Sequence, residues 1–248
     1  MSEKILEVKN LKREFVMGEE TVKALKGLSF TIHSGEFVTI MGHSGSGKTT
    51  LLNILGCLDR PTDGNYYLDG VNVEELDKNS LAELRNEKIG FVFQSYNLLP
   101  RTTALENVEM PMIYNKHIPS SERRDRALEA LKTVNLLNRA HHMPNQLSGG
   151  QQQRVAIARA LVSEPVIILA DEATGNLDTR TSYEIISLMQ DLNEKGKTIV
   201  FVTHEPDIAA FSQRTILLRD GLTQKDVINT EKRSAKKAIV SLPDPEKM

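Results

Sequence analysis

A glycine-rich loop that joins an apolar run to a helical pattern is the strongest constraint in this sequence. The run 37–41 reads as a buried strand, and a helix with a leucine-rich face starts at Thr49. The connecting residues are Gly42, His43, Ser44, Gly45, Ser46, Gly47, Lys48 and Thr49, followed by Thr50. Backbone N–H groups of such a loop point into one concavity, and the N-terminus of the following helix also favours anions. The loop therefore predicts a binding site for the phosphates of a nucleoside triphosphate.

A second motif predicts another phosphate-binding helix N-terminus. Leu147 is followed by Ser148, Gly149, Gly150 and Gln151, just ahead of a long helical pattern. One nucleotide does not need two such sites, so the second is expected to serve another copy of the chain. Two subunits would then clamp two ATP molecules between them, head to tail, and the clamp would close only around a γ-phosphate.

The order of the remaining patterns predicts an α/β fold. The apolar runs 166–170 and 198–202 are separated by a helical pattern that ends at Gly196, which is typical of a βαβ unit with a parallel sheet. Further strands are expected at 5–8, 23–32, 66–68, 89–93 and 215–218. We expect a P-loop NTPase core with a mostly parallel sheet, an N-terminal antiparallel β subdomain and an inserted α-helical subdomain.

The domain boundaries follow from where these patterns change. Residues 1–222 form one predicted ATPase domain, with the helical subdomain inserted at about 95–161. Residues 223–248 mix basic and acidic side chains without sustained periodicity, so a charged and flexible tail is predicted. A short docking helix, or contact with a membrane surface through the lysine cluster, is the alternative for this tail.

Composition narrows the location and the partners. The formal net charge is −2, which gives no electrostatic reason to expect a nucleic-acid partner. The single cysteine, Cys57, cannot form an internal disulfide and lies among leucines, so a buried thiol in a reducing compartment is expected. No apolar run approaches the roughly 18 residues that a membrane-spanning helix needs, and no secretory signal is visible at the N-terminus. The chain is expected to remain in the cytoplasm and not to cross a membrane.

Two carboxylates are candidates for the metal-binding and water-orienting groups that ATP hydrolysis needs. Asp171 and Glu172 follow the apolar strand directly, which puts both at the carboxyl edge of the sheet beside the loop. Phosphoryl transfer to water needs positive charge on the phosphates, a metal that bridges them and a group that orients the water. Lys48 is expected to reach the β- and γ-phosphates, and the Thr49 hydroxyl is expected to bind Mg²⁺. One carboxylate can then serve the metal and the other the water.

From about Ile5 to Gly221, the chain resembles the ATPase subunit of ABC transporters, on the strength of the two glycine motifs. The resemblance implies ATP and Mg²⁺ as ligands. It also implies that Asp171 supports the metal and that Glu172 polarises the attacking water. Gln94 matches the glutamine that contacts Mg²⁺ or water and senses the γ-phosphate, and His204 matches the histidine that hydrogen-bonds the γ-phosphate.

Three further positions take their interpretation from the same resemblance. Asp178, in the stretch Gly175-Asn176-Leu177-Asp178, is expected to cross the dimer interface. Phe15 matches the aromatic residue that stacks on adenine, and it keeps the π-face where the family often has tyrosine. The alternative is that Phe15 is an ordinary strand residue without a role in nucleotide binding. Ala173 departs from the proline that the family usually has there, which loosens the loop without removing a chemical group.

Stretches such as Leu58-Asp59-Arg60-Pro61-Thr62 and Asn97-Leu98-Leu99-Pro100 resemble the lipoprotein-releasing and macrolide-efflux branch of bacterial ABC systems. This implies an ATP-driven homodimer held at the inner membrane by a permease subunit, with a periplasmic adaptor in the efflux case. A cell-division ABC ATPase, which controls cell-wall hydrolases through a similar membrane partner and transports nothing, is the alternative. A soluble ABC ATPase that acts on ribosomes or DNA is a more distant one. The cargo is not encoded in this chain.

The segment 95–100 carries the last expectation. It connects Gln94 to the helical subdomain, and it contains aromatic and aliphatic side chains although a connecting loop of this kind could be entirely polar. By resemblance this is where the permease's coupling helix docks, with Leu98 as a contact residue. The alternative is that Leu98 belongs to the core.

Overall fold

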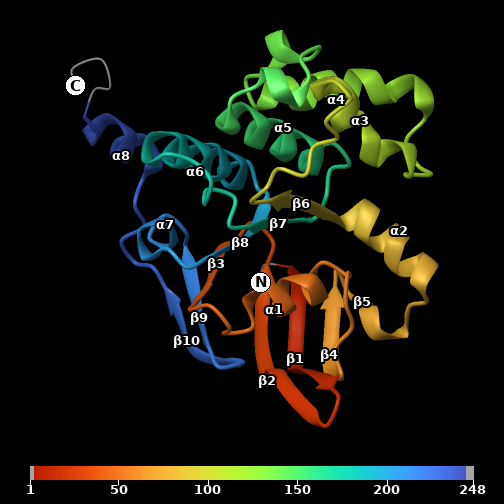
Figure 1. Cartoon of the computed structure of the whole chain (residues 1–248), viewed down its shortest axis with the longest axis vertical. Helices are drawn as coiled ribbons and strands as arrows, with labels where there is room; N and C mark the ends of the chain where they lie inside the picture. The colour runs from red at the N-terminus through yellow and green to blue at the C-terminus, as the bar shows by residue number, and fades with distance from the viewer. Residues whose placement is uncertain (1–2, 244–248) are drawn as a thin grey trace.

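The computed structural model describes residues 3–243, which form two sheets and a layer of helices (Figure 1). The strands are β1 (Lys4–Met17), β2 (Glu20–His33), β3 (Phe37–Gly42), β4 (Asp63–Leu68), β5 (Val71–Asn72), β6 (Ile89–Phe93), β7 (Ile167–Asp171), β8 (Thr198–Thr203), β9 (Arg214–Arg219) and β10 (Leu222–Ile228). The α-helices are α1 (Lys48–Leu55), α2 (Lys78–Lys88), α3 (Ala104–Ile113), α4 (Ser120–Thr133), α5 (Gly149–Leu161), α6 (Thr179–Glu194), α7 (Pro206–Ala209) and α8 (Ala235–Ser241). Short 3₁₀ turns lie at Val73–Glu75, Leu137–Arg139 and Pro144–Gln146.

The two sheets confirm the predicted fold class. The first is antiparallel, with strand order β2-β1-β4-β5. The second has the order β10-β9-β3-β8-β7-β6, and every pair in it is parallel except β9 with β10. Helices α3, α4 and α5 fall between β6 and β7 in the chain and contact one another in a separate layer (Figure 1). The antiparallel sheet lies at the opposite end of the molecule.

The central strands are apolar along their whole length because both faces of the parallel sheet are buried. In β7, Ile167 and Leu169 pack toward α1 and the antiparallel sheet, whereas Ile168 and Ala170 pack toward the helices. Every residue of β8 is buried as well. Because the faces are covered and the loops are not, polar side chains gather where the strands end.

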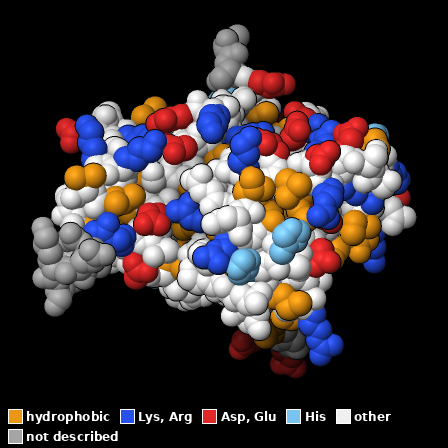
Figure 2. All heavy atoms as spheres, turned by 90° about the horizontal axis from the view of Figure 1, so that it is seen from above, with side chains coloured by type: hydrophobic (Ala, Val, Ile, Leu, Met, Phe, Trp, Pro, Cys, Tyr) orange, Lys and Arg blue, Asp and Glu red, His pale blue; other side chains and the backbone are white. Residues whose placement is uncertain are grey.

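The surface over the helices mixes both signs of charge. Seen from above in Figure 2, basic and acidic side chains alternate there, with isolated hydrophobic side chains between them. No helix within residues 3–243 is long and apolar enough to cross a membrane. Cys57 is buried, as predicted, and burial raises the pKa of its thiol to about 12.

The prediction of a flexible tail from 223 was wrong for the part that the structure describes. Strand β10 pairs with β9, and helix α8 packs on α6. Neither element has a clear sequence pattern, because β10 is an edge strand with mostly exposed side chains and α8 buries only the small Ala235 and Ala238. Residues 244–248 of the predicted tail lie outside the described residues.

Gln190 fastens this C-terminal segment to α6. Its side chain donates to the carbonyls of Phe211 and Arg233, both at 2.8 Å, and accepts from the N–H of Ala235 at 2.9 Å. Gln190→Leu leaves these buried groups unpaired, so we expect a loss of about 1–3 kcal/mol in the free energy of unfolding, measured by urea denaturation. Lys236→Ala, which removes only a surface ion pair with Asp191, is the control and should cost under about 1 kcal/mol. Equal effects of the two changes would contradict this account of the tail.

Candidate functional site

The phosphate loop is shaped by glycines that no other residue can replace without strain. Gly47 has a φ of 98°, and a Cβ on it would lie 2.7 Å from the carbonyl oxygen of Ala24. A Cβ on Gly42 would lie 2.4 Å from the Ser46 hydroxyl. The loop therefore turns tightly under strand β2, and its backbone starts helix α1 at Lys48.

The Lys48 ammonium is folded back over this loop. Lys48 Nζ donates to the carbonyl oxygens of Gly42 at 2.7 Å and His43 at 3.0 Å, and the residue is buried. An ammonium group has three donors, so one remains for a ligand oxygen. The cation is thus already held at the loop where the phosphates are predicted to bind.

Two carboxylates stand at the end of β7, opposite the loop. The pKa of Asp171 is raised by burial and by the neighbouring Glu172, with Lys48 acting in the other direction. Glu172 has a φ of 44°, and its N–H donates to the carbonyl of Val202 at 2.9 Å. This left-handed turn directs the Glu172 carboxylate away from the line of the strand. The adjacent Ala173 is buried.

His204 meets Glu172 because β7 and β8 are parallel neighbours whose carboxyl ends lie at the same edge. His204 Nδ1 lies 2.8 Å from Glu172 Oε1, and it is the donor because an ionised carboxylate only accepts. The histidine is exposed, whereas the glutamate is mostly covered. A ligand that reaches His204 therefore also approaches Glu172.

Gln94 follows β6 and links this edge to the residues after Glu172. Its Nε2 lies 3.4 Å from Asn176 Oδ1, and Asn176 Nδ2 donates to the Gln94 carbonyl at 3.1 Å. If the loop after β6 moves, it must therefore either break these two hydrogen bonds or move together with the loop that contains Asn176.

A single cavity of about 710 Å³ collects most of the predicted residues. It is lined by His43, Ser44, Gly45, Gly47, Lys48, Thr49, Thr50, Gln94, Asp171, Glu172 and His204. Val22, Lys23 and Ala24 of β2 complete the lining and were not predicted. No motif marks them, because they reach the loop through the fold of the antiparallel sheet.

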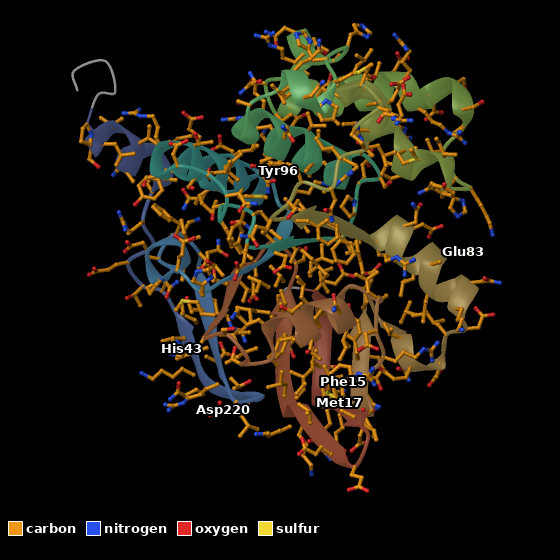
Figure 3. All side chains as sticks on the ribbon, viewed as in Figure 1. Phe15, Met17, His43, Glu83, Tyr96 and Asp220 are labelled. Atoms are coloured by element: carbon orange, nitrogen blue, oxygen red, sulfur yellow. The ribbon has the colours of Figure 1, made fainter. Side chains whose placement is uncertain are left out.

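Phe15 lies beside this cavity without lining it. It pairs with Val22 across the β1–β2 hairpin, and its ring is about a third exposed. Figure 3 shows it on this hairpin, with His43 at the phosphate loop. The Arg13 guanidinium carbon lies 4.4 Å from the centre of the Phe15 ring. The ring is therefore held by a cation on one side, and its role as an adenine platform stays a prediction.

The second motif lies in a different hollow, of about 350 Å³. Ser148 is the N-cap of α5, and it exchanges hydrogen bonds with Gln151 in a capping box. The hollow is lined by Asn135, Leu136, Ser148, Gly150, Gln151, Arg154, Thr181 and Glu184. Gly149 does not line it. Asp178 caps α6 by accepting from the N–H and hydroxyl of Thr181, and its place at the dimer interface stays a prediction. The two hollows share no lining residue.

The predicted Mg²⁺ ligands are chemically suited to that ion. Thr49, Gln94 and Asp171 line one cavity and offer a hydroxyl, an amide and a carboxylate oxygen, and Mg²⁺ prefers a few such ligands together with phosphate and water. Within residues 3–243 no group of three or more His, Cys, Asp or Glu could hold a metal by itself.

Asp171→Asn tests whether the ionised Asp171 carboxylate lowers the stability of the folded protein. Because the folded state raises the pKa of Asp171, it binds this proton more tightly than the unfolded state does. The resulting stability is present below the unfolded pKa and is lost as the pH rises through the folded pKa. We therefore expect Asp171→Asn to raise the free energy of unfolding of the nucleotide-free protein at neutral pH, and the gain to shrink toward pH 4. Urea denaturation across this range measures it, with the exposed Asp207→Asn as control; a variant no more stable than the original at pH 7 would contradict it.

Comparisons with known proteins bear directly on this arrangement. A family model described as ABC transporter matches residues 25–175. An uncharacterised ABC transporter ATP-binding protein of Bacillus subtilis, YvrO, is 54% identical over 88% of this chain and 94% of its own length. The ATP-binding cassette MJ0796 of Methanocaldococcus jannaschii, solved as a dimer in a post-hydrolysis state with ADP and Pi, superposes with a TM-score of 0.82. It is 51% identical, over 90% of this chain and 98% of that structure.

A longer relative combines two functions in one chain. The macrolide export ATP-binding/permease protein MacB of Hyphomonas neptunium is 50% identical over 93% of this chain, which spans 36% of that protein. The similarity is therefore confined to one part of the relative.

Proposed function

Because the chain belongs to the ABC transporter family, we propose that it is the ATP-hydrolysing subunit of a transporter of the lipoprotein-release and macrolide-efflux type, and that it acts as a head-to-tail dimer. The main observation in support of the dimer is that the phosphate loop and the Ser148 motif line two separate hollows of the same chain. A second copy that turns its Ser148 motif toward the first copy's loop would complete a nucleotide site at each end. That the related cassette MJ0796 was solved as a dimer supports this.

The residues at the cavity support a division of labour during hydrolysis. The N–H groups of Gly45 to Thr49 would hold the phosphate chain, and Lys48 would bind the β- and γ-phosphates. Glu172 would accept a hydrogen bond from the attacking water, and His204, already bonded to Glu172, would contact the γ-phosphate. The γ-phosphoryl group leaves the β-phosphate oxygen and is transferred to that water, giving ADP and phosphate.

Mg²⁺, when bound with ATP, would neutralise charge on the β- and γ-phosphates. Thr49, Gln94 and Asp171 are the residues of this chain proposed to hold it. Because the Gln94 side chain also contacts Asn176, Gln94 would connect the metal to the loop between β7 and α6.

The comparison with MacB supports a membrane partner. In that relative the ATP-binding and permease parts are named together, and this chain spans only the smaller share of it. We propose that a permease subunit supplies the remainder, and that it holds this chain at the cytoplasmic side of the inner membrane. A periplasmic adaptor belongs to the efflux form of this proposal.

A groove beside Gln94 is the proposed docking surface for the permease. It has a volume of about 240 Å³ and lies between β6, α2 and the helical layer. In the adjoining segment, Leu98 is partly buried and packs against the core, whereas Leu99 is 42% exposed. This packing favours the alternative that Leu98 belongs to the core, so Leu99 is the residue to test.

Leu99→Asp tests the permease partner. We expect the variant to keep the thermal stability and basal ATPase activity of the isolated subunit, because the side chain is exposed at a loop. Co-purification with the permease subunit should fall at least roughly tenfold, since a carboxylate would replace an apolar contact at the interface. Val240→Asp, at an exposed position on α8, is the control. A stable Leu99→Asp that co-purifies fully would exclude this segment from the interface, and failure of the original chain to co-purify would exclude the partner itself.

A further inference from the structure

A second charged cavity, of about 510 Å³, lies where the loop after α1 meets β1 and α2. Figure 1 shows α2 at the edge of the molecule, beyond β5. The cavity shares no lining residue with the phosphate-loop cavity. Its ionisable lining side chains, apart from a thiol, are four cations and one carboxylate: Arg13, Arg60, Lys78, Arg85 and Asp59. This is a formal surplus of three positive charges in a chain whose net charge is −2, so the cavity favours an anionic ligand.

Two guanidinium groups of this cavity are held in place by the surrounding backbone. Arg85 Nη1 donates to the carbonyl oxygen of Cys57 at 2.9 Å. Arg60 donates to the carbonyl oxygens of Glu74, at 3.2 Å, and Leu76. These bonds orient each guanidinium without cancelling its charge, because a carbonyl is neutral, and they leave other N–H donors of each group free. Donors that are already fixed lose little conformational entropy when a ligand binds.

The one carboxylate of the lining is already paired. Arg13 Nε and Nη2 donate to the two carboxylate oxygens of Asp59, at 2.8 and 2.9 Å, in a bidentate pair. Asp77, beside Lys78 in the chain, caps α2 by accepting from the N–H of Ser80 and does not line the cavity. Within residues 3–243, Lys78 and the two backbone-bound arginines form no ion pair. Three cations of the lining are therefore available to an anion.

The rest of the lining is apolar. Leu58 is 52% exposed, whereas Cys57 and Leu81 are buried. Leu81 lies on the same face of α2 as Lys78 and Arg85, because the three residues are spaced three and four positions apart. The Cys57 thiol adds no charge, since burial raises its pKa to about 12. An anion bound here therefore has apolar surface beside it, which suits an ester with a carbon chain better than a bare ion.

We propose that this cavity binds a phosphate ester whose phosphate group pairs with Arg60, Lys78 and Arg85. A phosphate monoester carries about two negative charges at neutral pH and offers three strong acceptor oxygens, which matches three cations better than one carboxylate does. Its carbon chain lies on Leu58. The ester is either a free phosphorylated metabolite or the headgroup of an acidic phospholipid.

This site goes beyond the proposed function and does not depend on the permease. The loop after α1 connects through that helix to the phosphate loop, and α2 leads directly into β6 and Gln94. A ligand that bridges Arg60 and Lys78 therefore joins the segment that follows the phosphate loop to the segment that precedes Gln94.

Calorimetric titration with glycerol 3-phosphate tests the free ester. The chain is first saturated with Mg-ADP, so that the phosphate loop is occupied. We expect Lys78→Glu to weaken binding at least roughly tenfold, because it replaces a ligand-binding cation by a repelling carboxylate. Lys78 makes no hydrogen bond or ion pair within residues 3–243, so the variant should keep its thermal stability. Arg124→Glu, at an exposed position on α4, makes the same change of charge and is the control, expected within about twofold of the original chain.

Flotation with phosphatidylcholine vesicles, with and without phosphatidic acid, tests the lipid headgroup in the same three chains. Binding of glycerol 3-phosphate that weakens in Lys78→Glu supports a free ester. Binding to the phosphatidic acid vesicles alone, again weakened in Lys78→Glu, supports a phospholipid. The proposal is overturned if neither probe binds, or if Lys78→Glu and Arg124→Glu weaken binding equally. Binding that is lost in Lys48→Ala and kept in Lys78→Glu belongs to the phosphate loop and overturns it as well.

Discussion

Replacing Glu172 by glutamine is expected to lower steady-state ATP turnover by at least about a hundredfold while ATP binding is retained. The substitution keeps the size of the side chain and an oxygen that can still accept from His204 Nδ1. It removes the negative charge that would orient the attacking water. The phosphate loop and Lys48, which lie on a different element, are untouched.

The retained γ-phosphate makes this variant a test of the dimer as well. If closure depends on intact ATP, Glu172→Gln with Mg-ATP should be dimeric by mass photometry, whereas the original chain should return to monomers as it hydrolyses the nucleotide. Glu129→Gln, an exposed glutamate paired with Lys132 on α4, is the control and should behave like the original chain. A Glu172→Gln variant that stays monomeric under saturating Mg-ATP would count against the head-to-tail arrangement.

The predicted site residues were recognisable because each follows a strand that the sequence marks clearly. Gln94, Asp171 and His204 come directly after or within one residue of buried apolar runs, and parallel strands bring their carboxyl ends to one edge. The strand pattern alone placed Asp171 and Glu172 at this edge, whereas Gln94 and His204 were predicted from the resemblance to ABC ATPases. The same logic gave the parallel sheet, since its strands are continuous apolar runs.

What the sequence could not reveal depends on contacts between distant segments. Val22 to Ala24 line the cavity through the register of an antiparallel sheet, and no local pattern encodes that register. Arg159 reaches Tyr96 and Asn97 across the boundary of two layers, although its position looks like one more charge on a helix. Leu98 and Leu99 are neighbours with the same side chain, and only the packing of the helical layer decides which one is exposed.

Mixing two inactive variants is expected to restore one nucleotide site, if Ser148 acts on the partner's ATP. Lys48→Ala removes the cation of the phosphate loop, and Ser148→Arg places a bulky cation at the start of α5. In a dimer of either variant, each composite site contains one lesion. In a mixed dimer, the loop of the Ser148→Arg chain meets the Ser148 motif of the Lys48→Ala chain, so one site is intact and both lesions fall in the other.

ATP-dependent pairing measured by mass photometry should therefore be absent from either variant alone and present in the mixture, in the mixed dimers only. The control mixes Lys48→Ala with a chain that carries both changes, because this pair cannot assemble an intact site. Ser148 is also the N-cap of α5, so its loss costs about 1 kcal/mol, and a thermal melt must show that the Ser148→Arg chain is folded. With both chains folded, the absence of recovery at every mixing ratio would mean that each nucleotide site is built within one chain. The separation of the two hollows in this structure would then need a movement that brings Ser148 to its own phosphate loop.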